Sequence, residues 1–111
     1  MMKVRIQDSR VAEGYRIADL NRRKAITERC LNCSGFSYVE RKKCEHTDCQ
    51  LWLYRLGIGK CESKARNSAI RTYCRDFCTE GGGYAVSRCP STNCPLFPYR
   101  MTKVDRTMEV L

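Results

Sequence analysis

The chain has 111 residues, a formal net charge of +9 and nine cysteines. About one residue in five is Leu, Ile, Val or Phe, which falls just below the roughly 20% at which a charged chain is expected to lack a sufficient core. Apolar burial is marginal at this length, so we expect the cysteines to supply the missing stability as metal ligands or disulfides. No apolar run is long enough for a transmembrane helix.

The first 21 residues carry charges throughout and lack the apolar stretch of a signal peptide. We therefore expect a cytoplasmic protein. In a reducing cytoplasm, clustered cysteines are more often metal ligands than disulfides, and an odd number of cysteines disagrees with complete pairing.

Residues 1–20 are interpreted as an N-terminal extension. Within it, the weak alternation of residues 3–7 predicts a strand, and residues 9–20 are predicted to form a helix, in spite of the glycine at position 14. The apolar residues at helical spacing, expected to face inward, are Val11, Tyr15 and Ala18.

Residues 21–57 are interpreted as a first cysteine module. We expect a helix that Asn21 caps and that ends at Cys30. After it, Gly35 predicts a turn, and residues 38–41 are predicted to form a short strand.

Residues 58–66 are interpreted as a glycine-containing linker and the start of a second helix, and residues 67–102 as a second module. Asn67 is predicted to cap this helix, which is expected to end at Cys74. Apolar residues recur along it every three to four positions, as on one helical face.

The remaining segments are short. Residues 84–86 are predicted to form a strand, and residues 94–98 an extended or turn segment because two prolines interrupt it. Residues 103–111 are interpreted as a C-terminal strand or tail, and the weak alternation of residues 104–111 predicts pairing with residues 3–7.

Two parts of the chain repeat one another. Residues 25–30 align with residues 69–74 at an offset of 44, and after one inserted residue the offset becomes 45. The cysteine spacings are C-x2-C-x10-C-x4-C and C-x3-C-x10-C-x4-C. The first quartet consists of Cys30, Cys33, Cys44 and Cys49, and the second of Cys74, Cys78, Cys89 and Cys94. Cys61 stands outside both quartets, and we interpret it as a buried or inert thiol, with a redox role or a role as a spare metal ligand as the alternatives.

Four thiolates at this spacing predict one structural zinc ion in each module, or two Zn²⁺ per chain. Such a site contributes on the order of 10 to 16 kcal/mol of apparent binding free energy, more than so short a module gains from its core. We therefore expect a small metal-stabilised α+β fold made of two tandem zinc modules, each ribbon- or knuckle-like and each with four cysteine ligands. Iron–sulfur clusters, disulfides, and ligation shared between the modules are the alternatives.

Catalysis is not expected, because a catalytic zinc ion keeps one position open and usually has histidine or carboxylate ligands. His46 is the only histidine. The second module has Ser91 at the equivalent position, so we interpret His46 as an exposed loop residue and not as a ligand.

The basic excess falls to about +5 when each zinc ion with its four thiolates is counted as −2. Among the remaining basic residues, Lys64, Arg71 and Arg75 share one face of the second predicted helix. Basic clusters of this kind bind nucleic-acid phosphates, although solvated faces look the same. The predicted contacts are Lys64, Arg71, Arg75, Arg22, Arg23, Lys24, Arg41, Lys42 and Lys43.

Arg55 and Arg100 follow a tyrosine at one shared repeat position. A guanidinium offers five N–H donors and no acceptor. We expect each arginine to close its own module by donating hydrogen bonds to carbonyls or thiolates.

At these residues the chain resembles a family of small bacteriophage and prophage proteins. The family is marked by A-I-x-x-x-C-x-x-C, a glycine-containing spacer and C-x4-C-P-L-W/F-P-Y-R, and the matching stretches are residues 25–55 and 69–100. One residue is inserted before Cys78, and Gln50 and Leu53 replace prolines of the pattern. The resemblance implies a phage or prophage setting in bacterial cytoplasm and a cysteine-bound metal, and it implies no particular activity.

The leading functional hypothesis is a zinc-binding protein that contacts DNA or RNA through its basic surface. The alternative is a protein-interaction module, such as a phage factor that binds or inhibits a host protein. A redox or electron-transfer role would need iron in place of zinc.

Overall fold

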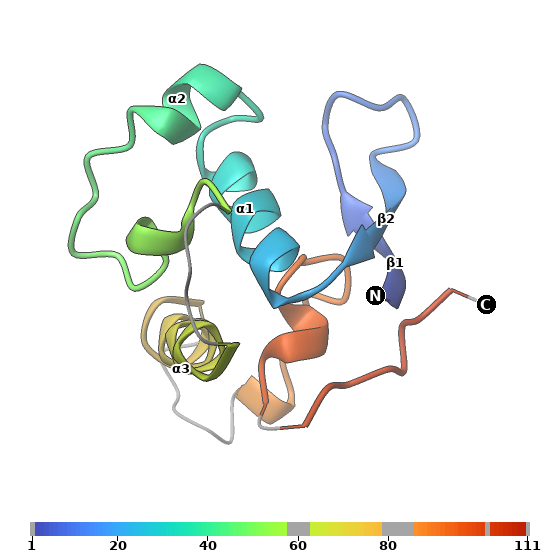
Figure 1. Ribbon diagram of the computed structural model, residues 1–111. Helices are drawn as coiled ribbons and strands as arrows, with labels where there is room; N and C mark the ends of the chain where they lie inside the picture. Colours follow the sequence, from blue (N-terminus) through green and yellow to red (C-terminus); the bar gives the residue numbers. More distant parts are fainter. Residues whose placement is uncertain (1, 58–62, 79–85, 102, 111) are drawn as a thin grey trace.

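The computed structural model describes residues 2–57, 63–78, 86–101 and 103–110. In this part of the chain, strands and short helices form a small α+β fold, with the strands at one side of the molecule and most of the helices at the other (Figure 1). The elements are β1 (Met2–Gln7), β2 (Tyr15–Leu20), α1 (Arg22–Cys33), α2 (Tyr38–Lys42), the 3-10 turn η1 (Trp52–Tyr54), α3 (Ser63–Tyr73), the π-helical turn η2 (Cys74–Cys78) and the 3-10 turn η3 (Phe97–Tyr99).

The N-terminal segment is an antiparallel hairpin, in which Met2 of β1 pairs with Leu20 of β2. The strand predicted over residues 3–7 is confirmed, but the helix predicted over residues 9–20 is wrong. Gly14 adopts a φ of +82° in the connecting loop, a conformation that ends a helix and suits a tight turn. The spacing of apolar residues in this segment also fits one face of a helix. In the structure, however, the backbone of β2 forms its hydrogen bonds with β1.

The C-terminal segment contributes less pairing than predicted. Val4 forms a single antiparallel bridge with Glu109, and the backbone N–H of Val110 donates to the carbonyl of Lys3 at 2.7 Å. Figure 1 accordingly shows the C-terminal segment running back towards β1. The predicted contact with β1 exists, but as a bridge and not as a third strand.

Asn21 caps α1 as predicted, because its side-chain oxygen accepts a hydrogen bond from the N–H of Lys24 at 2.9 Å. The helix does not end at Cys30 but continues to Cys33. Both cysteines of the C-x2-C pair therefore lie on its last turn.

The strand predicted over residues 38–41 is wrong, because this segment forms α2. The oxygen of Ser37 accepts a hydrogen bond from the N–H of Glu40 at 3.2 Å, and Ser37 with Glu40 has the spacing of a capping box. Of the strand predicted over residues 84–86, only Val86 lies in the described part of the chain, where it is helical. The turn predicted over residues 94–98 is confirmed and leads into η3.

α3 begins at Ser63, four residues before the predicted cap, so the cap prediction for Asn67 is wrong. The side-chain oxygen of Asn67 instead accepts a hydrogen bond from Nε of Arg22 on α1 at 3.1 Å. Beyond Tyr73 the helix continues as the π-helical turn η2 between Cys74 and Cys78. The residue inserted into the second C-x3-C pair lies within this wider turn, which accommodates it without breaking the helix.

One hydrophobic core connects the two repeats. It joins β1 to α1 and α3, and residues of both repeats lie within it, including Leu51 and its repeat counterpart Leu96. The α3 residues in the core are Ile70 and Tyr73. Within the described residues, no helix is long and apolar enough to cross a bilayer.

Candidate functional site

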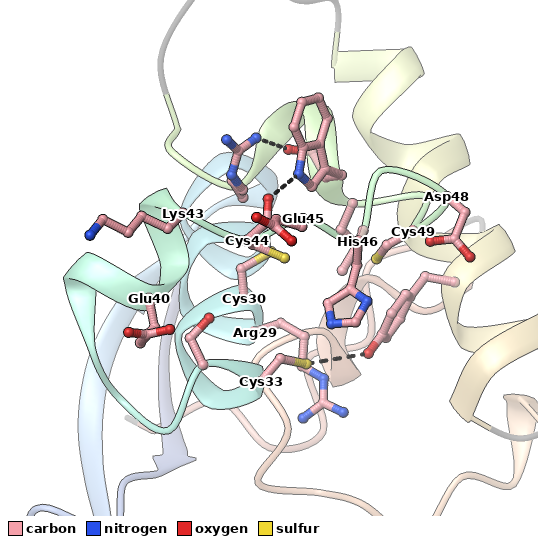
Figure 2. Close-up of a pocket in the computed structure, with 15 residues that line it drawn as sticks. Arg29, Cys30, Cys33, Glu40, Lys43, Cys44, Glu45, His46, Asp48 and Cys49 are labelled. Atoms are coloured by element: carbon pink, nitrogen blue, oxygen red, sulfur yellow. Dashed lines mark hydrogen bonds between the residues drawn. The ribbon is translucent and has the colours of Figure 1, made fainter.

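The four cysteines of the first repeat line one open pocket of about 800 Å³. Cys30 and Cys33 come from the end of α1, and Cys44 and Cys49 from the loop between α2 and η1. Figure 2 shows these side chains around the hollow. Tyr73 of α3 also lines it. The fold thus brings the whole first quartet of the sequence prediction to one place.

The thiols interact electrostatically across the pocket. The pKa of the Cys30 thiol is raised to about 12, mainly because the thiol is buried. Repulsion of its thiolate by Cys49, Cys33 and Cys44 contributes to the same rise. Burial also raises the pKa of Cys49. Ionised thiolates at these positions therefore need a compensating positive charge, which a bound metal ion supplies.

Cys33 differs from the other three cysteines of the pocket. It is the exposed one, whereas Cys30, Cys44 and Cys49 are half-buried. Its sulfur lies 3.7 Å from the hydroxyl of Tyr73. Arg29, beside Cys30, interacts electrostatically with Cys33, Tyr73 and Cys94, a cysteine of the second repeat.

The thiols line the pocket without forming a closed ligand cluster. Among the residues that the structure describes, no three Cys, His, Asp or Glu side chains are grouped closely enough to hold a metal ion as they stand. The donor types and their common pocket fit a thiolate-bound metal, and the side chains would have to turn inward to reach it.

The second quartet has a different setting. Cys74 is buried in the hydrophobic core, and Cys94 packs against that core. Cys89 is half-buried, and the side chain of Cys78 lies outside the described part of the chain, as does Cys61.

No known protein family, curated protein or solved structure significantly matches this chain.

The two arginines at the shared repeat position make the same hydrogen bonds one repeat apart. Arg55 donates to the carbonyls of Arg41, Trp52 and Lys42. Arg100 donates to the carbonyls of the residues 45 positions further on, which are Val86, Phe97 and Ser87. Each guanidinium also stacks on its aromatic neighbour, at 4.1 Å from the ring centre of Trp52 and 3.7 Å from that of Phe97. The expectation that these arginines bind carbonyls of their own repeat is confirmed.

His46 is exposed, as expected, but it also lines the cysteine pocket. Figure 2 shows its imidazole pointing into the hollow. Sequence reasoning missed this placement, because Ser91 at the equivalent repeat position argued against a shared role. The available signal was its position inside the C-x4-C loop, whose two ends both reach the pocket.

The basic residues predicted on the second helix are exposed, two of them on α3 and Arg75 on the adjoining η2. Lys64, Arg71 and Arg75 are exposed, while Ile70 and Tyr73 on the opposite side are buried. A groove of about 390 Å³ runs beside this face. Among the residues that the structure describes, its lining includes no acidic side chain and is formed by Ser68, Arg71, Thr72, Arg75, Val86, Arg100 and Met101.

Three of the other predicted contacts make structural interactions. Arg22 donates to Asn67, Arg23 donates to the carbonyl of Gly57 at 2.6 Å, and Arg41 donates to the carbonyl of Thr27. Gly57 has a φ of +68°, and a Cβ there would lie 2.8 Å from Cγ2 of Thr27, so this turn favours glycine. Exposed side chains are left at Lys24, Lys42 and Lys43.

Proposed function

We propose that the protein is a zinc-stabilised nucleic-acid-binding protein whose contact surface is the exposed face of α3. The observation that carries this proposal is the exposure of Lys64 and Arg71 on α3 and of Arg75 on the adjoining η2. They lie at or near a groove in which the lining residues that the structure describes include no acidic side chain. A nucleic-acid backbone presents closely spaced phosphates, and arginine and lysine neutralise them while releasing counterions.

Arg71 and Arg75 are exposed, whereas Arg100 is buried. Arg75 makes an exposed ion pair with the adjacent Asp76, 3.1 Å from Nε to Oδ1. Exposed pairs of this kind contribute about 0 to 1 kcal/mol, so a phosphate can displace the carboxylate at little cost. Ser68 and Thr72, on the neighbouring turns of α3, add hydroxyl donors to the groove.

Zinc has a structural role in this proposal. Thiolates of the first cysteine pocket hold one ion, and the spacing of the second quartet predicts another. Tyr73 of α3 reaches the first pocket, so a metal ion there also fixes α3, which carries the basic face. Nucleic-acid affinity should therefore depend on bound metal.

The experiment is a binding titration with a generic DNA duplex and an RNA strand over a range of salt concentrations. The triple variant Lys64→Ala, Arg71→Ala and Arg75→Ala should bind more weakly, with a salt slope reduced by about one for each lost phosphate contact. The matched control removes three exposed positive charges elsewhere, through Lys3→Ala, Arg5→Ala and Lys103→Ala. Equal losses in the two triple variants, or no binding by the wild type at about 50 mM salt, would contradict the proposal.

A second candidate function, protein binding, is favoured by a separate observation. Tyr38 and Val39 of α2 and Leu53 of η1 are large, exposed hydrophobic side chains, and Leu53 is 75% exposed. Tyr38 and Val39 are consecutive residues, and exposed apolar side chains that lie together occur at protein interfaces. A partner captured through this surface should survive nuclease treatment and be lost in Leu53→Ser.

A further inference from the structure

We infer that His46 is a ligand of the metal ion in the first pocket. It takes the fourth position beside Cys30, Cys44 and Cys49 and leaves Cys33 as a free thiol. The inference rests on the proposed zinc site and deepens it by naming the ligands.

The loop that carries His46 turns tightly over the pocket. The N–H of Cys49 donates to the carbonyl of His46 at 2.9 Å, and the N–H of Thr47 donates to the carbonyl of Glu45 at 2.8 Å. This turn places His46 on the lining of the pocket, with its imidazole pointing inward (Figure 2). Imidazole nitrogen and thiolate sulfur are the usual ligands of structural zinc, and three cysteines with one histidine form a standard structural set.

The charges around the pocket favour three thiolates over four. Zinc with four thiolates carries −2, whereas zinc with three thiolates and a neutral imidazole carries −1. The part of the lining that the structure describes holds equal numbers of charged groups of each sign, namely Arg29, Lys43 and Arg55 against Glu40, Glu45 and Asp48. Arg55 is also engaged by three backbone carbonyls, so the lining offers no surplus positive charge to balance a doubly negative centre.

Cys33 is the thiol that the site can release. It already has polar neighbours in the Tyr73 hydroxyl, 3.7 Å away, and in the charged Arg29. It is also the exposed member of the quartet, so leaving it unligated buries no unsatisfied group. In the second repeat Ser91 replaces His46, which makes this ligand set a property of the first repeat alone.

The test compares three single variants of the full, reduced chain: His46→Ala, Cys33→Ser and the control Thr47→Ala, whose side chain does not line the pocket. Each is titrated against a zinc chelator. His46→Ala should lower the affinity for one zinc ion by more than roughly 10- to 100-fold, which is the cost of losing a residue that only supports a ligand. The other two variants should keep the zinc affinity of the wild type. Zinc retained in His46→Ala but lost in Cys33→Ser would overturn the inference and leave the proposed zinc site intact. A wild type that binds no zinc would overturn both.

A second measurement needs no variant and therefore does not depend on folding of His46→Ala. The zinc-loaded wild type is treated with iodoacetamide, and the modified cysteines are located by peptide mass spectrometry. Cys33 should be alkylated while Cys30, Cys44 and Cys49 are protected. Protection of all four would overturn the inference while supporting the zinc site, and alkylation of all four would overturn both.

Discussion

Arg55 and Arg100 occupy the same repeat position and donate to carbonyls 45 residues apart, yet their surroundings differ. Arg55 is half-buried at the edge of an open pocket. Arg100 is 6% exposed and makes an additional ion pair with Asp105, 2.8 Å from Nη1 to Oδ2. The repeated sequence therefore determines the local hydrogen bonds, whereas packing determines how much each arginine contributes and which repeat presents its cysteines to solvent.

The largest effect should come from Arg100→Ala. Its removal takes the guanidinium away from Oδ2 of Asp105, from three backbone carbonyls and from the face of Phe97, while Oδ1 of Asp105 keeps its hydrogen bonds from Thr107. Breaking one side of a buried ion pair costs about 3 to 5 kcal/mol, so we expect a loss of that size in the free energy of unfolding, measured by urea titration.

Arg55→Ala is the matched comparison. Its three carbonyls lie nearer to solvent, where water replaces the lost donor, so we expect a loss of about 1 to 2 kcal/mol. Equal destabilisation by the two variants would show that burial does not distinguish the repeats.

Much of the local structure could be predicted from the sequence. The Asn21 cap, the strand at residues 3–7 and the shared role of Arg55 and Arg100 all depend on neighbours in the chain or on the repeat. The spacing of Ser37 and Glu40 is also typical of a capping box and could have predicted α2. The glycine-containing spacer was instead interpreted as a turn followed by a strand.

Three features were missed because contacts between residues far apart in the chain determine them. Apolar residues between positions 9 and 20 fit a helix until β1 is present as a partner. Asn67 looks like a cap until Arg22, 45 residues away, donates to its oxygen. His46 could be placed in the pocket only once α1 and the C-x4-C loop were seen side by side.

A smaller effect on stability is expected at acid pH from the ion pair between Arg100 and Asp105, which Arg55 lacks. Hydrogen bonds from Thr107, and then Arg100, hold the pKa of the Asp105 carboxyl below its usual range. A depressed folded-state pKa stabilises the protein above the unfolded value of about 4 and loses this contribution as the pH falls towards the folded value. Urea midpoints between pH 7 and pH 3 should therefore fall less for Asp105→Asn than for the wild type. Parallel curves would contradict this assignment.

The smallest effect is expected for Trp52→Phe, which copies Phe97 into the first repeat. Nε1 of Trp52 donates to the carbonyl of Cys44 at 2.7 Å, and phenylalanine has no such donor. One hydrogen bond contributes about 0.5 to 1.5 kcal/mol, so the free energy of unfolding should drop by that amount with the metal still bound. A loss above about 3 kcal/mol would mean that the indole also fills space that a phenylalanine ring leaves empty. Trp52 and Phe97 would then not be equivalent.

The most direct test of the account is the stability of the reduced protein with and without metal. We expect the purified chain to carry bound zinc, with at least one ion held by the first pocket, and to lose most of its resistance to urea when a chelator removes it. A fully reduced, metal-free chain with the same urea midpoint as the zinc-loaded protein would contradict the account.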